Sequence, residues 1–279
     1  MVLLHIKRGE TSQFLFETTV NIDVSKLTQE IAAIYNGRLK IRRICAGLKC
    51  CCHAIIDRVS RFVSLSEMEE LANYGCMLPL EIRELNDEQV DELKLVDSWS
   101  DVCIPSGGYT QTIDPVRRRN GRQPLSNMQE VLTKTVNEAV AMVDKNLIED
   151  NKPLVQKNIK EALDLLRGAV TIVYPMQLPP HDSIRNEFQN TEDLSGTQAA
   201  LEVIEPAKVQ LWFAGKQLLP DRKLADFIGK NDKCKVIVKL QNSGEGPPGR
   251  AICLHLLIFL MWNLIFQDRS WTSVQWDGT

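Results

Sequence analysis

The sequence predicts an α+β fold in which a small sheet and its helix are interrupted by a long, mostly α-helical insertion. The first 37 residues have the pattern of a hairpin followed by a helix. Residues 205–241 contain two further strand patterns, and residues 38–204 between them repeat apolar side chains mainly at helical spacing. We therefore expect the two outer segments to form one sheet around a shared core.

The amino-terminal segment alternates like a strand and then changes to helical spacing. Val2, Leu4 and Ile6 occupy alternate positions, and a short polar stretch leads to a second apolar run. Asp23 predicts the start of a helix and Gly37 predicts its end. The apolar positions of this helix, spaced by three and four, are Val24, Leu27, Ile31 and Ile34.

The downstream strands carry a more specific likeness. The run Leu-Trp-Phe-Ala-Gly-Lys-Gln-Leu at 211–218, followed by the segments 221–227 and 234–240, resembles the second half of ubiquitin with one residue deleted near Gly229. The resemblance implies a ubiquitin-like β-grasp that is split between the two ends of the chain. A long insertion in a surface loop of such a fold has a modest entropic cost.

This interpretation divides the chain into four parts. The β-grasp would consist of residues 1–37 and 205–241, with the helical insertion at 38–204. A linker and an apolar tail would follow at 242–279. Because the chain continues past the last strand, we do not expect conjugation through a carboxyl end of the kind that ubiquitin uses.

Two apolar side chains of the predicted sheet are candidates for a protein-binding patch. Strand alternation places Trp212 and Ile237 on the outer face, where ubiquitin carries its apolar binding patch. The alternative is a Trp212 that is partly covered by the insertion.

Helix-start signals and a one-sided apolar pattern organise the insertion. Ser66 with Glu69 has the form of a capping box, and Ser126 with Gln129 repeats it. The second signal predicts a helix to about Leu147, and a partner helix is expected to follow toward Gly168.

A second resemblance covers most of the chain. The stretch 167–182, rich in proline, and the polar stretch 193–198 are similar to the Kurly family of cilia- and flagella-associated proteins, as are residues 1–44 and 66–250 as a whole. The resemblance implies a protein of motile cilia that is found in the cytoplasm, in the cytoskeleton and at the basal body of the cilium. It also implies a role in outer dynein arm assembly and in cilium positioning through planar cell polarity.

Two segments depart from that family. Residues 46–65 resemble an additional exon, and the charged helix and polar tail expected after Arg250 are replaced by the apolar run 251–266. This run is shorter than the roughly 20 residues that span a bilayer. We favour a variant terminus over a membrane tail anchor.

No cofactor, metal or catalytic site is predicted. The adjacent thiols of Cys50, Cys51 and Cys52 beside His53 do not converge as zinc ligands do, and no phosphate-binding motif is present in the sequence. Acidic positions such as Glu67 and Glu70 are expected on a solvated helix face. The remaining candidate is a basic contact loop for an acidic partner, formed by Arg117, Arg118, Arg119 and Arg122.

Composition agrees with a protein that binds other proteins. With 33 Lys and Arg against 36 Asp and Glu, the net charge of −3 favours neither nucleic acid nor an anionic membrane. The start of the sequence lacks a secretory pattern, so the 8 cysteines are expected as free thiols in the cytoplasm.

The leading hypothesis is a non-enzymatic adaptor whose partners are dynein-arm assembly factors or chaperones. The alternatives are a ubiquitin-like adaptor of the proteasome pathway and, third, a tail-anchored membrane protein.

Overall fold

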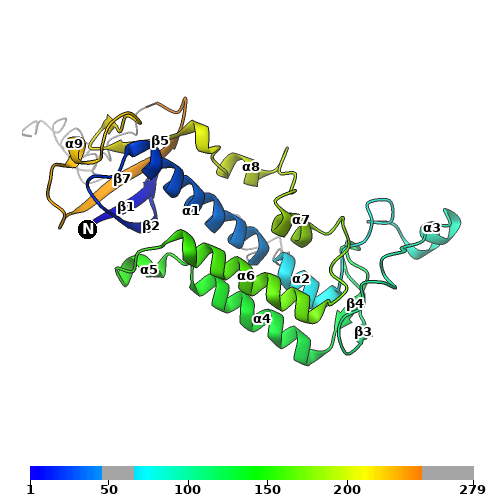
Figure 1. Ribbon diagram of the computed structural model, residues 1–279. Helices are drawn as coiled ribbons and strands as arrows, with labels where there is room; N and C mark the ends of the chain where they lie inside the picture. Colours follow the sequence, from blue (N-terminus) through cyan, green and yellow to red (C-terminus); the bar gives the residue numbers. More distant parts are fainter. Residues whose placement is uncertain (46–65, 247–279) are drawn as a thin grey trace, which may run out of the picture.

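The computed structural model describes residues 1–45 and 66–246, and it contains a five-stranded sheet, a group of helices and a small two-stranded sheet (Figure 1). In chain order the elements are β1 (Val2–Arg8), β2 (Thr11–Thr18), α1 (Val24–Cys45), α2 (Glu67–Tyr74), α3 (Asp87–Glu92), β3 (Tyr109–Gln111), β4 (Arg122–Pro124), α4 (Ser126–Ala141), α5 (Asn146–Glu149), α6 (Gln156–Val173), α7 (Ser183–Gln189), α8 (Gln198–Glu202), the 3-10 helix η1 (Pro206–Lys208), β5 (Val209–Phe213), β6 (Lys216–Gln217), α9 (Ala225–Ile228) and β7 (Lys235–Asn242).

The predicted α+β class is confirmed, and the main sheet is built from both ends of the described chain. Its strand order is β2-β1-β7-β5-β6, with β1 parallel to β7 and antiparallel to β2. The other pairs are antiparallel. The likeness to ubiquitin itself stays a prediction, as does the division into domains.

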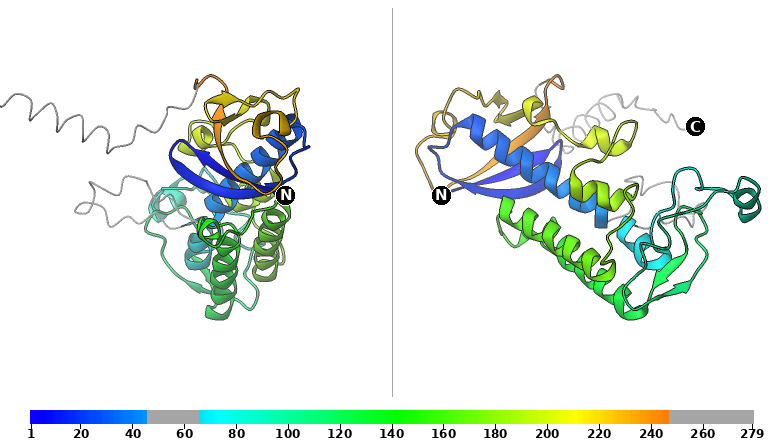
Figure 2. Two further views of the ribbon diagram at one scale, coloured as in Figure 1. Left: turned by 90° about the vertical axis from the view of Figure 1, so that its left-hand side faces the viewer. Right: turned by 45° about the vertical axis from the view of Figure 1, so that its right-hand side comes forward.

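Strand alternation decides which side chains enter the core. In the register of the central pair, Leu4 lies opposite Val236 and Ile6 lies opposite Val238, and all four are buried. Helix α1 crosses this face of the sheet (Figure 2). The entry to α1 is joined to the downstream half, because the Val24 amide donates to the Arg222 carbonyl oxygen at 3.0 Å.

Helix α1 is longer than the sequence predicted. It continues through Gly37 to Cys45, so the prediction that Gly37 ends the helix is wrong. A Cβ atom at Gly37 would lie 2.5 Å from Cγ2 of Ile159. The glycine therefore permits close packing of α1 against α6, and it does not serve as a helix cap.

The helical part packs around the second half of α1. The predicted capping box at α2 is confirmed, with the Glu69 amide donating to Ser66 Oγ at 3.1 Å. The second predicted box is absent, because α4 starts one residue earlier at an N-cap of Leu125. The side chain of Gln129 instead donates to the Ala72 carbonyl oxygen at 3.0 Å.

The predicted helix hairpin is present with shifted ends. Helix α4 ends at Ala141, before the expected Leu147, and the carbonyl oxygen of nearby Val143 accepts a hydrogen bond from Arg38 Nε at 2.8 Å. Helix α6 runs past Gly168 to Val173. Buried apolar residues form one cluster that extends from the sheet through α1 into α2, α4 and α6.

Candidate functional site

The outer face of the main sheet carries the predicted apolar pair. Trp212 lies opposite Lys239 in the β5–β7 register, so Ile237 is its diagonal neighbour on the same face. The Ile237 side chain is 51% exposed, and Trp212 is half-buried. The indole Nε1 of Trp212 is buried without a hydrogen-bond partner.

Basic side chains surround this pair. His5 lies opposite Ile237, and Lys7 lies opposite Lys239. Burial and the positive charges of Lys7 and Lys235 lower the pKa of the His5 imidazole. The apolar pair therefore lies beside an imidazole that is uncharged at neutral pH, with the side chains of Lys7, Lys235 and Lys239 around it.

One edge of this face is covered by the segment between α5 and α6. Leu15, on β2 opposite His5, is fully buried, and its carbonyl oxygen accepts a hydrogen bond from the Leu154 amide at 2.7 Å. On the neighbouring strand, Lys235 Nζ lies 3.0 Å from Asn151 Oδ1. The cover thus reaches β2 and the start of β7, whereas Ile237 remains half-exposed.

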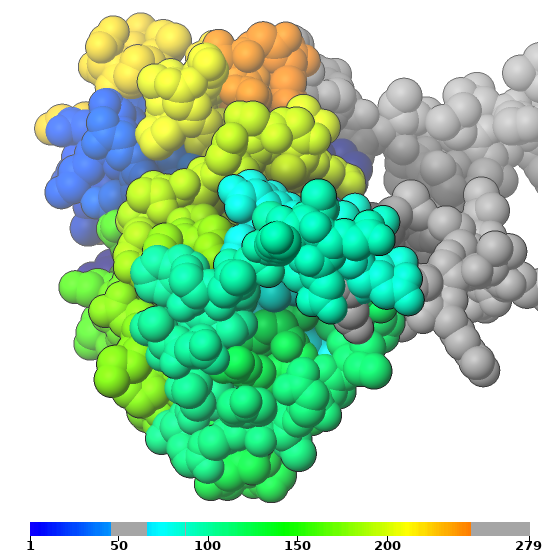
Figure 3. Space-filling view, turned by 90° about the vertical axis from the view of Figure 1, so that its right-hand side faces the viewer, coloured from blue at the N-terminus to red at the C-terminus, as the bar shows by residue number. Residues whose placement is uncertain are grey.

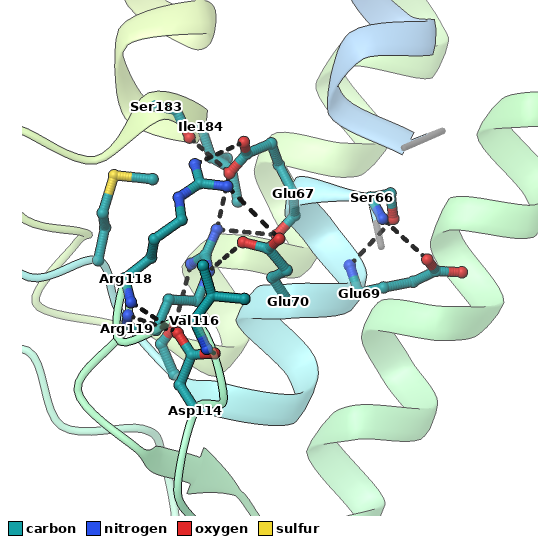
Figure 4. Close-up of polar contacts among 12 residues, drawn as sticks. Ser66, Glu67, Glu69, Glu70, Asp114, Val116, Arg118, Arg119, Ser183 and Ile184 are labelled. Atoms are coloured by element: carbon teal, nitrogen blue, oxygen red, sulfur yellow. Dashed lines mark hydrogen bonds and ion pairs between the residues drawn. The ribbon is translucent and has the colours of Figure 1, made fainter. Parts of the chain in front are cut away.

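The predicted basic loop is part of the segment between α2 and α4, which lies at the end of the molecule away from the main sheet (Figure 1) and forms much of the face shown in Figure 3. Arg119 of this loop is fully buried, and its guanidinium group reaches across to α2 (Figure 4). Its Nη2 lies 2.9 Å from Glu67 Oε2, and its Nε lies 3.2 Å from Glu70 Oε2. Arg119 is therefore a structural cation and does not lie on the surface.

A carboxylate shapes the loop that delivers Arg119. Asp114 Oδ2 accepts hydrogen bonds from the amides of Arg118 and Arg119 at 2.8 and 2.9 Å, and its Oδ1 accepts from Val116 at 2.9 Å. Arg117 within this turn adopts a positive φ of 55°. The turn directs two successive arginines toward α2.

A third carboxylate links the cluster to α7. Asp182 Oδ2 lies 3.8 Å from Arg119 Nη1 and accepts the Met77 amide at 3.2 Å, while its Oδ1 accepts from the Ile184 amide at the start of α7. The hydroxyl of Ser183 donates to Glu67 Oε2 at 2.8 Å. We call Glu67, Glu70, Arg119 and Asp182 the ionic cluster.

The two glutamates of the ionic cluster differ in their electrostatics. Burial acts to raise the pKa of the Glu67 carboxyl, but Arg119 and Arg118 outweigh it and hold this pKa below its usual range. For Glu70, burial dominates over the same arginines, and its pKa is raised. The expectation of a solvated acidic face is thus wrong for this pair, because buried or half-buried arginines neutralise it.

The remaining basic positions also have partners within the chain. Arg118 Nη2 lies 3.2 Å from Glu67 Oε1, Arg117 Nη1 donates to a backbone carbonyl at 2.9 Å, and Arg122 pairs with Asp101 at 2.9 Å. Sequence reasoning found these arginines but missed their acidic partners. No local pattern indicated them, because about 50 residues separate Arg119 from Glu67 and Glu70.

No metal-binding group emerges within the part of the chain that the structure describes. There, no three His, Cys, Asp or Glu side chains converge in a way that could hold an ion. The run Cys50 to His53 lies outside the described residues. Among residues 1–45 and 66–246, no helix is both long and apolar enough to span a bilayer, and the apolar run 251–266 also lies outside them.

The comparisons with known proteins place the chain in a family. Residues 209–255 match the family described as cilia- and flagella-associated protein 298. Proteins of that name from Drosophila melanogaster, Mus musculus and Homo sapiens are 54%, 50% and 48% identical to this chain over 250 residues, covering 90% of this chain and 79% of each relative. No solved structure matches it. The chain belongs to the cilia- and flagella-associated protein 298 family.

Proposed function

We propose that this chain is a non-enzymatic adaptor in the assembly of outer dynein arms of motile cilia. The observation that carries the proposal is family membership, since relatives named as cilia- and flagella-associated align with 90% of the chain. An adaptor of this kind works in the cytoplasm and at the basal body, where it also contributes to cilium positioning through planar cell polarity. Its partners are cytoplasmic assembly factors or chaperones of the dynein arms.

We assign partner contact to the outer sheet face around Trp212 and Ile237. An apolar centre with a rim of charge is the usual composition of a protein-binding surface. The half-buried Trp212 presents part of its indole ring on this face, and tryptophan is enriched among residues that dominate binding energy. The ionic cluster is excluded from this role because Arg119 is buried.

The test is affinity capture of the full chain from ciliating cells that lack their own copy. Ile237→Glu places a carboxylate at the centre of the face, and Lys235 and Lys239 beside it offset the added charge within the folded protein. We expect recovery of dynein arm subunits and their assembly factors to fall at least about tenfold. Electron microscopy of the cilia should show loss of outer arms.

Ile113→Glu is the matched control. Ile113 is 82% exposed and lies in the loop between β3 and β4, far from the main sheet (Figure 1). If Ile237→Glu and Ile113→Glu lose capture equally, the outer sheet face is not the partner-binding surface. If the parent chain recovers proteasome or ubiquitin-ligase subunits and no dynein arm proteins, the ubiquitin-pathway alternative replaces the ciliary one.

A further inference from the structure

A groove between α4 and α6 is a second surface with the properties of a binding site. It encloses about 590 Å³ and lies along the outer side of the helix pair. Val131 and Met142 line it from α4, and Leu165 and Ile172 line it from α6. In Figures 1 and 2 the two helices lie side by side along the lower edge of the molecule.

Helix α6 has two apolar faces, and only one of them is buried in the core. The core face includes Ile159 and Leu166, which are buried. The second face carries Leu165, Gly168 and Ile172 at spacings of three and four, and the two large side chains are 42% and 58% exposed. Isolated exposed apolar residues need no explanation, but an aligned stripe that faces apolar residues of α4 indicates a missing partner.

Gly168 provides an independent observation. It lies inside an 18-residue helix, where glycine is less stable than alanine by about 1 kcal/mol. A Cβ atom at Gly168 would meet no atom within 4 Å, so no contact within the described chain requires its absence. The missing side chain leaves the floor of the groove open to close approach by another backbone.

The charges of the groove indicate the chemistry of its occupant. Its lining contains two ionisable side chains, Glu161 and Asp164, and both are acidic. Each forms an exposed pair on α6, with Lys157 at 3.4 Å and Arg167 at 3.0 Å. Exposed ion pairs of this type contribute little to stability. A cationic side chain of a partner can therefore replace Lys157 or Arg167 beside these carboxylates.

We propose that the groove between α4 and α6 binds an amphipathic helix of a partner protein. The apolar face of that helix lies against Leu165 and Ile172, a small residue lies over Gly168, and Lys or Arg side chains face Glu161 and Asp164. This is the helix-in-groove mode of recognition, with charge complementarity at one wall. It uses a surface separate from the outer sheet face.

The test uses the full chain and a fluorescent synthetic helix of Leu, Ala and Lys, about five turns long. We expect Gly168→Leu, which fills the floor of the groove, to weaken binding of this probe at least about tenfold in anisotropy titrations. Gly168→Ala should weaken binding less while raising the melting temperature. If Gly168→Ala is more stable than the parent chain and still binds the probe more weakly, the weaker binding comes from a blocked groove and not from a damaged fold.

Two controls make the result specific. A second probe with Glu in place of Lys should bind more weakly than the first, and the difference should shrink at high salt. Ile237→Glu, on the sheet face, should bind the Lys probe like the parent chain.

The proposal is overturned if Gly168→Leu binds the Lys probe normally, if both probes bind alike, or if Ile237→Glu abolishes binding. It is also overturned if sedimentation shows a dimer of this chain that Gly168→Leu dissociates, because a second copy would then occupy the groove.

Discussion

At the scale of single residues, the ionic cluster shows how a charge is held in the interior of the protein. Arg119 is fully buried, yet carboxylates of Glu67, Glu70 and Asp182 offset its desolvation, and its pKa is raised. Removing one partner from such a group leaves a charge partly uncompensated. The cluster should therefore contribute to stability in a way that depends on pH.

Glu67→Gln should lower the free energy of unfolding at neutral pH by roughly 1–3 kcal/mol, because it removes a charged hydrogen-bond partner of Arg119 and Ser183. The pKa of Glu67 is lowered in the folded state, so its contribution is complete above the pKa of the unfolded chain and is lost as pH falls through the folded value. The difference between parent and variant should thus shrink below about pH 4.5.

Urea unfolding at a series of pH values measures this difference. Glu81→Gln, at an exposed carboxylate, serves as the control. A gap between parent and Glu67→Gln that stays constant down to about pH 3 would contradict the assignment, because Glu67 should by then be largely protonated in the unfolded chain.

At the scale of elements, two helical glycines are expected to respond in opposite ways to the same substitution. Gly37→Ala forces a methyl group against Ile159, and overpacking of this kind costs about 1–3 kcal/mol. Gly168→Ala meets open space and should gain about 0.5–1 kcal/mol from helix propensity. Chemical denaturation of the two variants gives both values.

A double-mutant cycle identifies the cause at Gly37. If Ile159 is the obstacle, Gly37→Ala combined with Ile159→Ala should be less destabilised than the sum of the two single variants by at least about 0.5 kcal/mol. Strict additivity would mean that the methyl group is accommodated in some other way.

The sequence predicted elements best where the pattern is local. Two strand patterns were predicted within residues 205–241, and β5 (Val209–Phe213) and β7, which begins at Lys235, confirm them. Gly37 was misinterpreted because its role depends on Ile159, more than a hundred residues away. The pairing of Glu67 and Glu70 with Arg119 was missed because it also joins residues far apart in the sequence. Acidic residues on a helix show the same sequence pattern whether they face solvent or a buried cation.

The candidate sites were predictable to different degrees. The outward direction of Trp212 and Ile237 follows from strand parity, and the structure places both on the outer face. The burial of Arg119 depends on the path of the loop around Asp114, which no residue spacing specifies. The groove beside Gly168 requires the relative placement of two helices, so sequence periodicity alone could not reveal it.

At the scale of the whole molecule, one apolar cluster joins the sheet to the helices, so the two parts should unfold together. Leu240, in β7, and Leu132, in α4, are both fully buried. Either Leu→Ala substitution should cost about 2–5 kcal/mol and should accelerate hydrogen exchange in both parts. Exchange that increases only near the altered residue would show that the main sheet and the helices are separate cooperative units.

The parallel pairing of β1 with β7 also determines when the main sheet can form during synthesis of the chain. Leu4 meets Val236 only after the ribosome has made more than 200 further residues, which takes roughly 10–40 s at about 5–20 residues per second. During that interval the hairpin and α1 emerge with their apolar faces lacking their final neighbours. Nascent chains of this protein should therefore depend on chaperones that bind before translation ends, and a slowly translated message should extend that dependence.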